Sequence, residues 1–128
     1  MASEETTAVI KILIVDDEQD ICYFLSRNLS EKGYATSFSN SLAEASLRLK
    51  QDPPDLLLLD NHLPDGKGVE FARDINEKYP SIKVVMITAH DSPQDRSRAY
   101  GNGISFFLSK PFTMASVNQV VELVINNR

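Results

Sequence analysis

The stretch Asp55-Leu56-Leu57-Leu58-Leu59-Asp60 decides the fold, because four consecutive leucines stand between turn-forming residues and end on an acid. A run that is apolar on both faces is typical of a central strand covered by helices on each side. The run therefore predicts a strand that places Asp60 at its carboxyl end. Open α/β sheets bind ligands at that edge, although an aspartate there can also serve simply to open a loop.

Length and composition limit the chain to one globular domain. The 128 residues are 42% hydrophobic and 24% charged, which is ordinary for a folded protein. The net charge of −5 argues against direct binding of nucleic acid, because phosphate contacts need clustered lysine and arginine. Cys22 is the single cysteine, the N-terminus lacks the features of a signal peptide, and no apolar run approaches the roughly 20 residues of a membrane-spanning helix. We therefore expect a cytoplasmic protein without a disulfide, a membrane span or a nucleic-acid surface.

Apolar runs and helical patterns alternate along the chain. Besides 55–60, strands are expected at 10–15, 34–38, 82–87 and 104–108. Helices are expected at 18–32, 42–49, 71–79, 92–102 and 117–125, the first followed by a C-cap glycine, Gly33, and the fourth being the weakest. Five strand–helix repeats predict an α/β domain with a doubly wound, five-stranded parallel sheet. Residues 1–9 are expected to be a flexible lead-in to a domain at 10–128.

Polar residues follow four of the predicted strands at the point where each strand ends. They are Asp16, Asp17, Asp60, Thr88 and Lys110. The carboxyl ends of parallel strands share one edge of a sheet, so we expect these side chains to converge. Carboxylates drawn together repel one another unless a cation lies between them, and oxygen ligands with open positions suit Mg²⁺. An ammonium and a hydroxyl beside them suit a transferred phosphoryl group, which makes Asp60 the candidate nucleophile.

The converging residues resemble the receiver domain of two-component response regulators, from about Lys11 to the last predicted helix. The resemblance is carried by Asp16-Asp17, by Asp60 with Leu63-Pro64 and Gly68, by Thr88-Ala89 and by Lys110-Pro111-Phe112. It implies a flavodoxin-like (βα)5 fold with strand order 2-1-3-4-5. It also implies a role for each residue at the predicted edge.

The implied roles at the metal are as follows. Asp60 would be the phosphoacceptor, and Asp17 and Asp60 would bind Mg²⁺ directly. His62 would offer its backbone carbonyl to the metal, and Asp16 would act through water. From the residues alone, Asp16 and Asp17 are also explained as N-cap residues of the following helix, and Glu18 as a solvated acid of its first turn.

The resemblance further implies a switch. The Thr88 hydroxyl would move to the phosphoryl group on Asp60, and the ring of Phe107 would turn inward into the space left behind. Packing in the core is the simpler explanation for an aromatic residue in an apolar strand, so both explanations of Phe107 stay open. Lys110, which would contact the phosphoryl group, would precede Pro111 through a cis peptide bond.

Both histidines fall beside the predicted chemistry, because His62 follows Asp60 by two residues and His90 follows Thr88 by two. In the family, side chains at these positions flank the path of the water that hydrolyses the acyl phosphate. We therefore hypothesise that the two rings set the lifetime of phospho-Asp60. A second metal site is the alternative, but two imidazoles without a third ligand at a suitable spacing are weak support for it.

The predicted function is that of a phosphoacceptor receiver domain. A histidine kinase or phosphotransfer protein would phosphorylate Asp60 with Mg²⁺, and an effector domain or partner protein would respond to the changed surface. Such a domain is not a classical enzyme, because it catalyses only its own phosphorylation and dephosphorylation.

Two other functions are compatible with an α/β domain of this kind. One is a Mg²⁺-dependent phosphatase or phosphotransferase that forms an aspartyl phosphate with a small substrate, which the lack of a pocket signature opposes. The other is a flavin- or nucleotide-binding domain, which would need a glycine-rich loop where Asp16 and Asp17 stand. A fragment of a longer regulator and a stand-alone protein are equally expected, and phosphorylation-dependent dimerisation through the fourth helix is left open.

Overall fold

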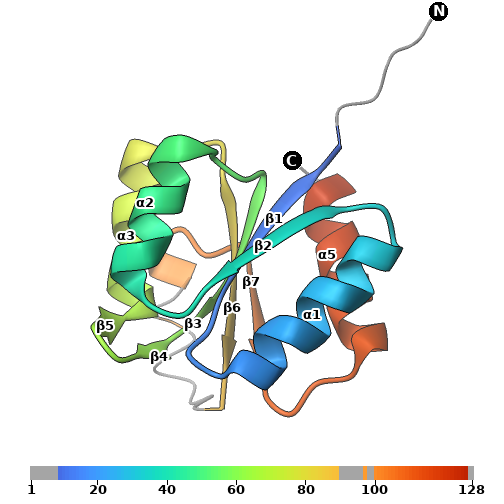
Figure 1. The fold of residues 1–128 in the computed structure, drawn as a ribbon. Coiled ribbons are helices and arrows are strands. Elements are labelled where there is room, and N and C mark those ends of the chain that lie inside the picture. Colours follow the sequence, from blue (N-terminus) through green and yellow to red (C-terminus); the bar gives the residue numbers. More distant parts are fainter. Residues whose placement is uncertain (1–8, 90–96, 98–99, 127–128) are drawn as a thin grey trace, which may run out of the picture.

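The computed structural model describes residues 9–89, 97 and 100–126, and it has a parallel sheet between two layers of helices (Figure 1). Neighbouring strands pair in the order β2-β1-β3-β6-β7, and every pair is parallel. The strands are β1 (Lys11–Val15), β2 (Ala35–Ser39), β3 (Leu56–Asp60), β6 (Lys83–Thr88) and β7 (Phe106–Ser109). Because β4 and β5 lie in a separate sheet, this is the expected 2-1-3-4-5 order.

The leucine run forms β3, the central strand, in which every residue is buried. It pairs with β1 on one side and with β6 on the other. Leu57 and Leu59 belong to the core on one face of the sheet, and Leu56 and Leu58 belong to the core on the other. The absence of polar alternation in the run is thus explained, because side chains that point to either face enter a helix-covered core.

Helices cover both faces of the sheet (Figure 1). α1 (Gln19–Glu31) and α5 (Met114–Asn126) lie on one face, while α2 (Leu42–Gln51) and α3 (Gly68–Lys78) lie on the other. Gly33, just beyond α1, has a φ of 97° and donates its N–H to the Ser30 carbonyl at 3.0 Å. This is the C-cap conformation expected from the sequence.

The segment between β3 and α3 was expected to be a loop, but it contains a short antiparallel hairpin of β4 (His62–Leu63) and β5 (Gly66–Lys67). At its turn, the two carboxylate oxygens of Asp65 accept hydrogen bonds from the N–H groups of Leu42 and Ala43, both at 2.9 Å. The hairpin is therefore fastened to the first turn of α2. These two hydrogen bonds hold the pKa of Asp65 below its ordinary value.

The other differences from the expected elements are shifts at their ends. β2 and β6 each begin and end one residue later than predicted, while β7 begins two residues later and ends one residue later. Residues 1–8 of the expected lead-in and most of the expected helix at 92–102 lie outside the described residues. Among the helices that are described, none is long and apolar enough to cross a membrane.

Candidate functional site

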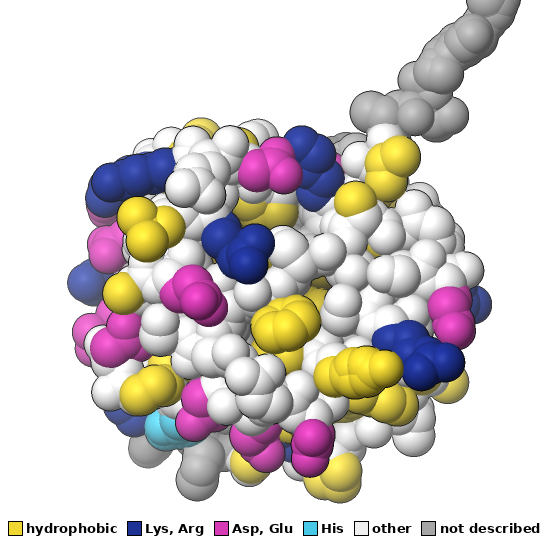
Figure 2. All heavy atoms as spheres, in the orientation of Figure 1, with side chains coloured by type: hydrophobic (Ala, Val, Ile, Leu, Met, Phe, Trp, Pro, Cys, Tyr) yellow, Lys and Arg dark blue, Asp and Glu magenta, His cyan; other side chains and the backbone are white. Residues whose placement is uncertain are grey.

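The predicted site residues meet where the parallel strands end. Asp60 is the last residue of β3 and Thr88 is the last residue of β6. A pocket of about 250 Å³ opens at this edge, and Asp60, Thr88 and Lys110 line it together with His62 and two residues of the loop after β1. Those two are Asp17 and Glu18. Figure 2 shows acidic side chains along the lower edge of one face, below the start of α1 in Figure 1.

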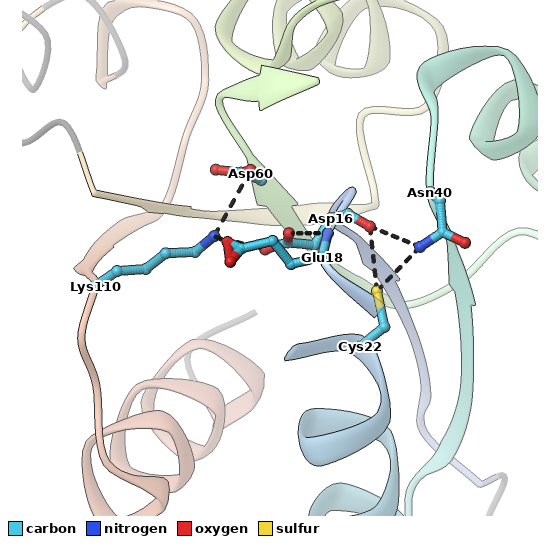
Figure 3. Close-up of polar contacts among 6 residues, drawn as sticks. All are labelled: Asp16, Glu18, Cys22, Asn40, Asp60 and Lys110. Carbon is cyan, nitrogen blue, oxygen red and sulfur yellow. Dashed lines mark hydrogen bonds and ion pairs between the residues drawn. The ribbon is translucent and has the colours of Figure 1, made fainter. Parts of the chain in front are cut away.

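Lys110 is the cation at the centre of the acidic group (Figure 3). Its Nζ atom lies 2.9 Å from Asp16 Oδ2, 2.9 Å from Glu18 Oε1 and 3.7 Å from Asp60 Oδ2. The backbone also places it, because its N–H donates to the Thr88 carbonyl at 2.8 Å. The bond from Lys110 to Pro111 is cis, as the resemblance implied.

Asp16 is fully buried beneath the pocket, although the next residue, Asp17, is exposed. Its Oδ1 atom accepts the N–H of Glu18 at 2.9 Å, so the acidic loop closes on itself in a local turn. Burial raises the pKa of the Asp16 carboxyl, while that hydrogen bond and the Lys110 ammonium oppose the shift. The loop therefore presents one buried acid and two accessible ones.

Asp60 is 5% exposed, and its environment disfavours its charge. Burial is the main cause and the nearby charge of Asp16 the next, and together they raise the pKa of Asp60 from its ordinary 3.8 to about 6. The Lys110 ammonium and the N–H groups of His62 and Asn61 act in the opposite direction. A cation placed at the pocket would favour the ionised, nucleophilic form of Asp60.

The backbone beyond Asp60 turns sharply and depends on Gly68. The Gly68 N–H donates to the Asn61 carbonyl at 2.9 Å, and Asn61 Oδ1 accepts the N–H of Val69 at 2.9 Å. A Cβ atom at position 68 would lie 2.2 Å from the carbonyl oxygen of Asp60. The start of α3 can pass this close to the end of β3 only because residue 68 has no side chain.

Gly68→Ala is therefore expected to lower the free energy of unfolding by about 1–3 kcal/mol, because the backbone at Asp60 must shift to make room. Urea unfolding measures the change. Gly101→Ala is the matched control, since a Cβ there meets no atom within 4 Å and it should be close to neutral. Equal stability changes in the two variants would contradict this explanation of Gly68.

The comparisons with known proteins agree with this geometry. The family model described as the response regulator receiver domain matches residues 12–122. The chain belongs to this family. Receiver domains are signalling domains rather than classical enzymes, and they generally bind Mg²⁺ at an acidic cluster.

Curated relatives of this receiver domain are regulators. It is 35% identical over 118 residues to the response regulator protein PilR of Pseudomonas aeruginosa, covering 92% of this chain and 26% of PilR. It is 37% identical over 101 residues to the KDP operon transcriptional regulatory protein KdpE of Escherichia coli, covering 79% of this chain and 44% of KdpE. The chain thus spans less than half the length of these relatives.

A solved structure shows the same fold. The CheY-like receiver domain protein from Methanospirillum hungatei superposes with a TM-score of 0.90 at 22% identity, covering 94% of this chain and 96% of that one. The flavodoxin-like arrangement expected from the sequence is thereby confirmed.

The residues of this receiver domain fit a divalent cation. Carboxylate oxygens of Asp16, Asp17 and Glu18 lie within 4.8 Å of one another, and Asp60 lines the same pocket. In the described part of the chain, Lys110 is the single cation that pairs with these acids, so negative charge is in excess. The donors are all oxygen atoms, which is the ligand chemistry of Mg²⁺.

Other predicted residues lie around this centre or apart from it. Phe107 is 7% exposed and belongs to the core on the α2–α3 face of the sheet rather than to the pocket lining. His62 lines the pocket, and its Nδ1 atom lies 3.3 Å from Lys67 Nζ across the short hairpin. His90 lies outside the described residues.

Sequence reasoning missed two contributions to the site. Glu18 was expected to be a solvated acid of the first turn of α1; it is half exposed, but its carboxylate also pairs with Lys110. Asn40, which had no expected role, donates from Nδ2 to the Asp16 carbonyl at 2.8 Å. The available signal was its position directly after β2, whose carboxyl end reaches the same edge of the sheet.

Cys22 lies behind the acidic loop, where its thiol donates to the Asp16 carbonyl at 3.2 Å and is fully buried. Burial, followed by the Asp16 charge, raises the pKa of the thiol to about 11.

We expect a disulfide reagent at pH 8 to label Cys22 about 10²-fold more slowly in the folded protein than in urea. Labelling at the same rate in both would contradict the buried placement.

Proposed function

We propose that this receiver domain is phosphorylated on Asp60 by a histidine kinase or phosphotransfer protein, and that the acids beside it hold the Mg²⁺ required. The observation that carries the proposal is the pocket at the end of β3. It places one buried carboxylate among accessible acids and an ammonium, which is a suitable surrounding for a transferred phosphoryl group.

The chemistry is an in-line displacement at phosphorus. A carboxylate oxygen of Asp60 forms the new O–P bond as the N–P bond of the donor phosphohistidine breaks, and the leaving imidazole keeps the electron pair. Water later cleaves the acyl phosphate, releasing phosphate and restoring the Asp60 carboxylate. Lys110, now 3.7 Å from Asp60 Oδ2, is placed to pair with a phosphoryl oxygen.

The proposed metal ligands are the side chains of Asp17 and Asp60 and the backbone carbonyl of His62, with Asp16 acting through water. Bound Mg²⁺ would supply positive charge that offsets the charge gathering on the phosphoryl oxygens during transfer. Glu18 lines the same pocket and pairs with Lys110, so in this proposal its carboxylate would compete with the phosphoryl group for the Lys110 ammonium.

The proposed response begins at Thr88, whose hydroxyl would contact the phosphoryl group from the end of β6. Phe107 lies on the neighbouring strand, where Met86 of β6 is its register partner. A shift of Thr88 would therefore be passed to the packing around Phe107. An effector domain or partner protein would respond to the resulting surface.

The proposal is tested by incubating the protein with acetyl phosphate and measuring its intact mass. We expect the mass increase of one phosphoryl group with Mg²⁺, no increase with EDTA, and none in Asp60→Asn. Asp74→Asn is the matched control, because it removes an exposed carboxylate of α3 and should be modified like the wild type. Modification of the Asp60→Asn variant would refute the assignment of the nucleophile.

The phosphatase considered from the sequence is not favoured by the family membership. Adding a small phosphomonoester to the protein with Mg²⁺ distinguishes the two functions, because a phosphatase would turn over the phosphomonoester many times. A receiver domain should instead take up one phosphoryl group from acetyl phosphate and leave the phosphomonoester intact.

A further inference from the structure

Asn40 connects the acidic loop to two neighbouring elements. It follows β2 directly, and its side chain crosses to the end of β1, where Nδ2 lies 2.8 Å from the Asp16 carbonyl oxygen and 3.6 Å from Cys22 Sγ (Figure 3). The carbonyl oxygen has two lone pairs, and the amide and the thiol occupy both. The amide is the stronger of the two donors.

The orientation of the Asn40 amide is determined by its partners. A carbonyl oxygen only accepts, so the nitrogen of the amide must face Asp16. On the other side, Asn40 Oδ1 accepts from Gln19 Nε2 at 3.1 Å, in the first turn of α1. The backbone N–H of Asn40 donates to Glu44 Oε1 at 3.0 Å, in the first turn of α2. Asn40 is therefore held by both helices.

The carbonyl that Asn40 binds marks the point where the chain leaves the sheet. The Asp16 N–H still pairs with the Ser39 carbonyl at 3.1 Å, as a continuation of the ladder between β1 and β2. The next two residues carry the carboxylates that lie within 4.8 Å of the Asp16 side chain. The peptide plane between Asp16 and Asp17 thus sets the direction in which these acids project.

Like charges this close repel one another, so the backbone must be restrained if the acids are to stay together before a cation arrives. Without the Asn40 amide, the Asp16 carbonyl would keep only the weak thiol donor of Cys22. The peptide plane would then be freer to rotate, and the acids would spread apart. A cation would then have to bring the acids together again, and the free energy needed for this would lower its affinity.

We propose that Asn40 is a positioning residue for the Mg²⁺ site: through the Asp16 carbonyl, its amide fixes the acidic loop in its cation-binding arrangement. The inference rests on the proposed function, because it concerns the same metal site. Partners that orient metal ligands typically change metal affinity by about 10–100-fold when they are removed. For Asn40→Ala we expect the lower end of that range, since Cys22 still contacts the carbonyl.

The test is the dissociation constant of Mg²⁺, measured by isothermal titration calorimetry on the full chain. Asn40→Ala should bind Mg²⁺ about 10-fold more weakly than the wild type. Asn40→Asp keeps the size of the side chain but can no longer donate, and it adds a negative charge. Charge alone would strengthen cation binding, so weaker binding by Asn40→Asp identifies the lost donor as the cause.

Two controls separate positioning from general stability. Asn28→Ala removes another asparagine amide that donates to a carbonyl at 2.8 Å, but on α1 away from the pocket, and Mg²⁺ affinity should not change. Ser41→Ala removes the N-cap hydroxyl that accepts the Glu44 N–H. It should cost about 1 kcal/mol of stability, also without a change in Mg²⁺ affinity.

A metal-free measurement is hydrogen exchange of the Glu18 amide in EDTA, which should be faster in Asn40→Ala than in either control.

The inference is overturned if Asn40→Ala binds Mg²⁺ like the wild type, or if Asn40→Asp binds it as tightly or more tightly. In that case wild-type phosphorylation with Mg²⁺ would still support the proposed function. If the wild type itself bound no Mg²⁺ and took up no phosphoryl group, the proposed function would fail, and the role of Asn40 with it.

Discussion

Replacing Asp60 with asparagine should make the metal-free protein more stable at pH 8, by about 2–3 kcal/mol. The pKa of Asp60 is raised to about 6 in the folded protein, from 3.8. The folded state therefore holds the Asp60 proton more tightly than the unfolded chain does. This favours folding below pH 4, and the contribution is lost as the pH rises through 6. Asparagine has no charge to bury, so the stability of the variant does not fall in this pH range.

The measurement is urea unfolding of wild type and Asp60→Asn in EDTA at several pH values. The stability difference should be small at pH 4 and should grow between pH 4 and pH 7. Mg²⁺ should then stabilise the wild type more than the variant, because a cation offsets the buried charge. If the difference were independent of pH, burial of the Asp60 charge would not be its cause.

Replacing Lys110 with methionine should have the opposite effect, lowering the metal-free stability at pH 8 by about 2–4 kcal/mol. The ammonium lies 2.9 Å from the buried Asp16 carboxylate, which would be left without its compensating charge. The expected loss is below that of a fully buried pair, because Glu18 is half exposed and Lys110 itself is 13% exposed.

Thermal or urea unfolding of Lys110→Met in EDTA and in Mg²⁺ tests this expectation. Mg²⁺ should recover much of the lost stability, since it supplies positive charge to the same acids. Lys32→Met removes an exposed lysine after α1 and should change stability by no more than about 0.5 kcal/mol. A Lys110 variant as stable as this control would show that the ion pairs with Asp16 and Asp60 contribute little.

The central part of the fold could be predicted from the sequence because its signals are strong and local. Four leucines without polar alternation specify a strand buried on both faces, and alternating strands and helices specify a parallel sheet. Once the sheet is parallel, the acids after β1, the acid that ends β3 and Lys110 after β7 must share one edge. The grouping of the site therefore followed from topology.

Other features could not be predicted, because they depend on side-chain geometry or on pairing too short to leave a periodic pattern. The hairpin of β4 and β5 has two residues in each strand, so no alternation marks it. The ends of β6 were misplaced by one residue because polar residues, Lys83 and Thr88, begin and end this strand. Glu18 turns toward Lys110, and Asn40 reaches the Asp16 carbonyl, and neither direction is encoded in residue type alone.

The central claim is that Asp60, and no other carboxylate of the chain, receives the phosphoryl group. Borohydride reduces an acyl phosphate to an alcohol, so treatment after phosphorylation converts the modified aspartate to homoserine, which peptide mass spectrometry locates. We predict homoserine at position 60 alone, in samples that received both acetyl phosphate and Mg²⁺. Homoserine at Asp16, Asp17 or any other acid, with position 60 unchanged, would contradict the account.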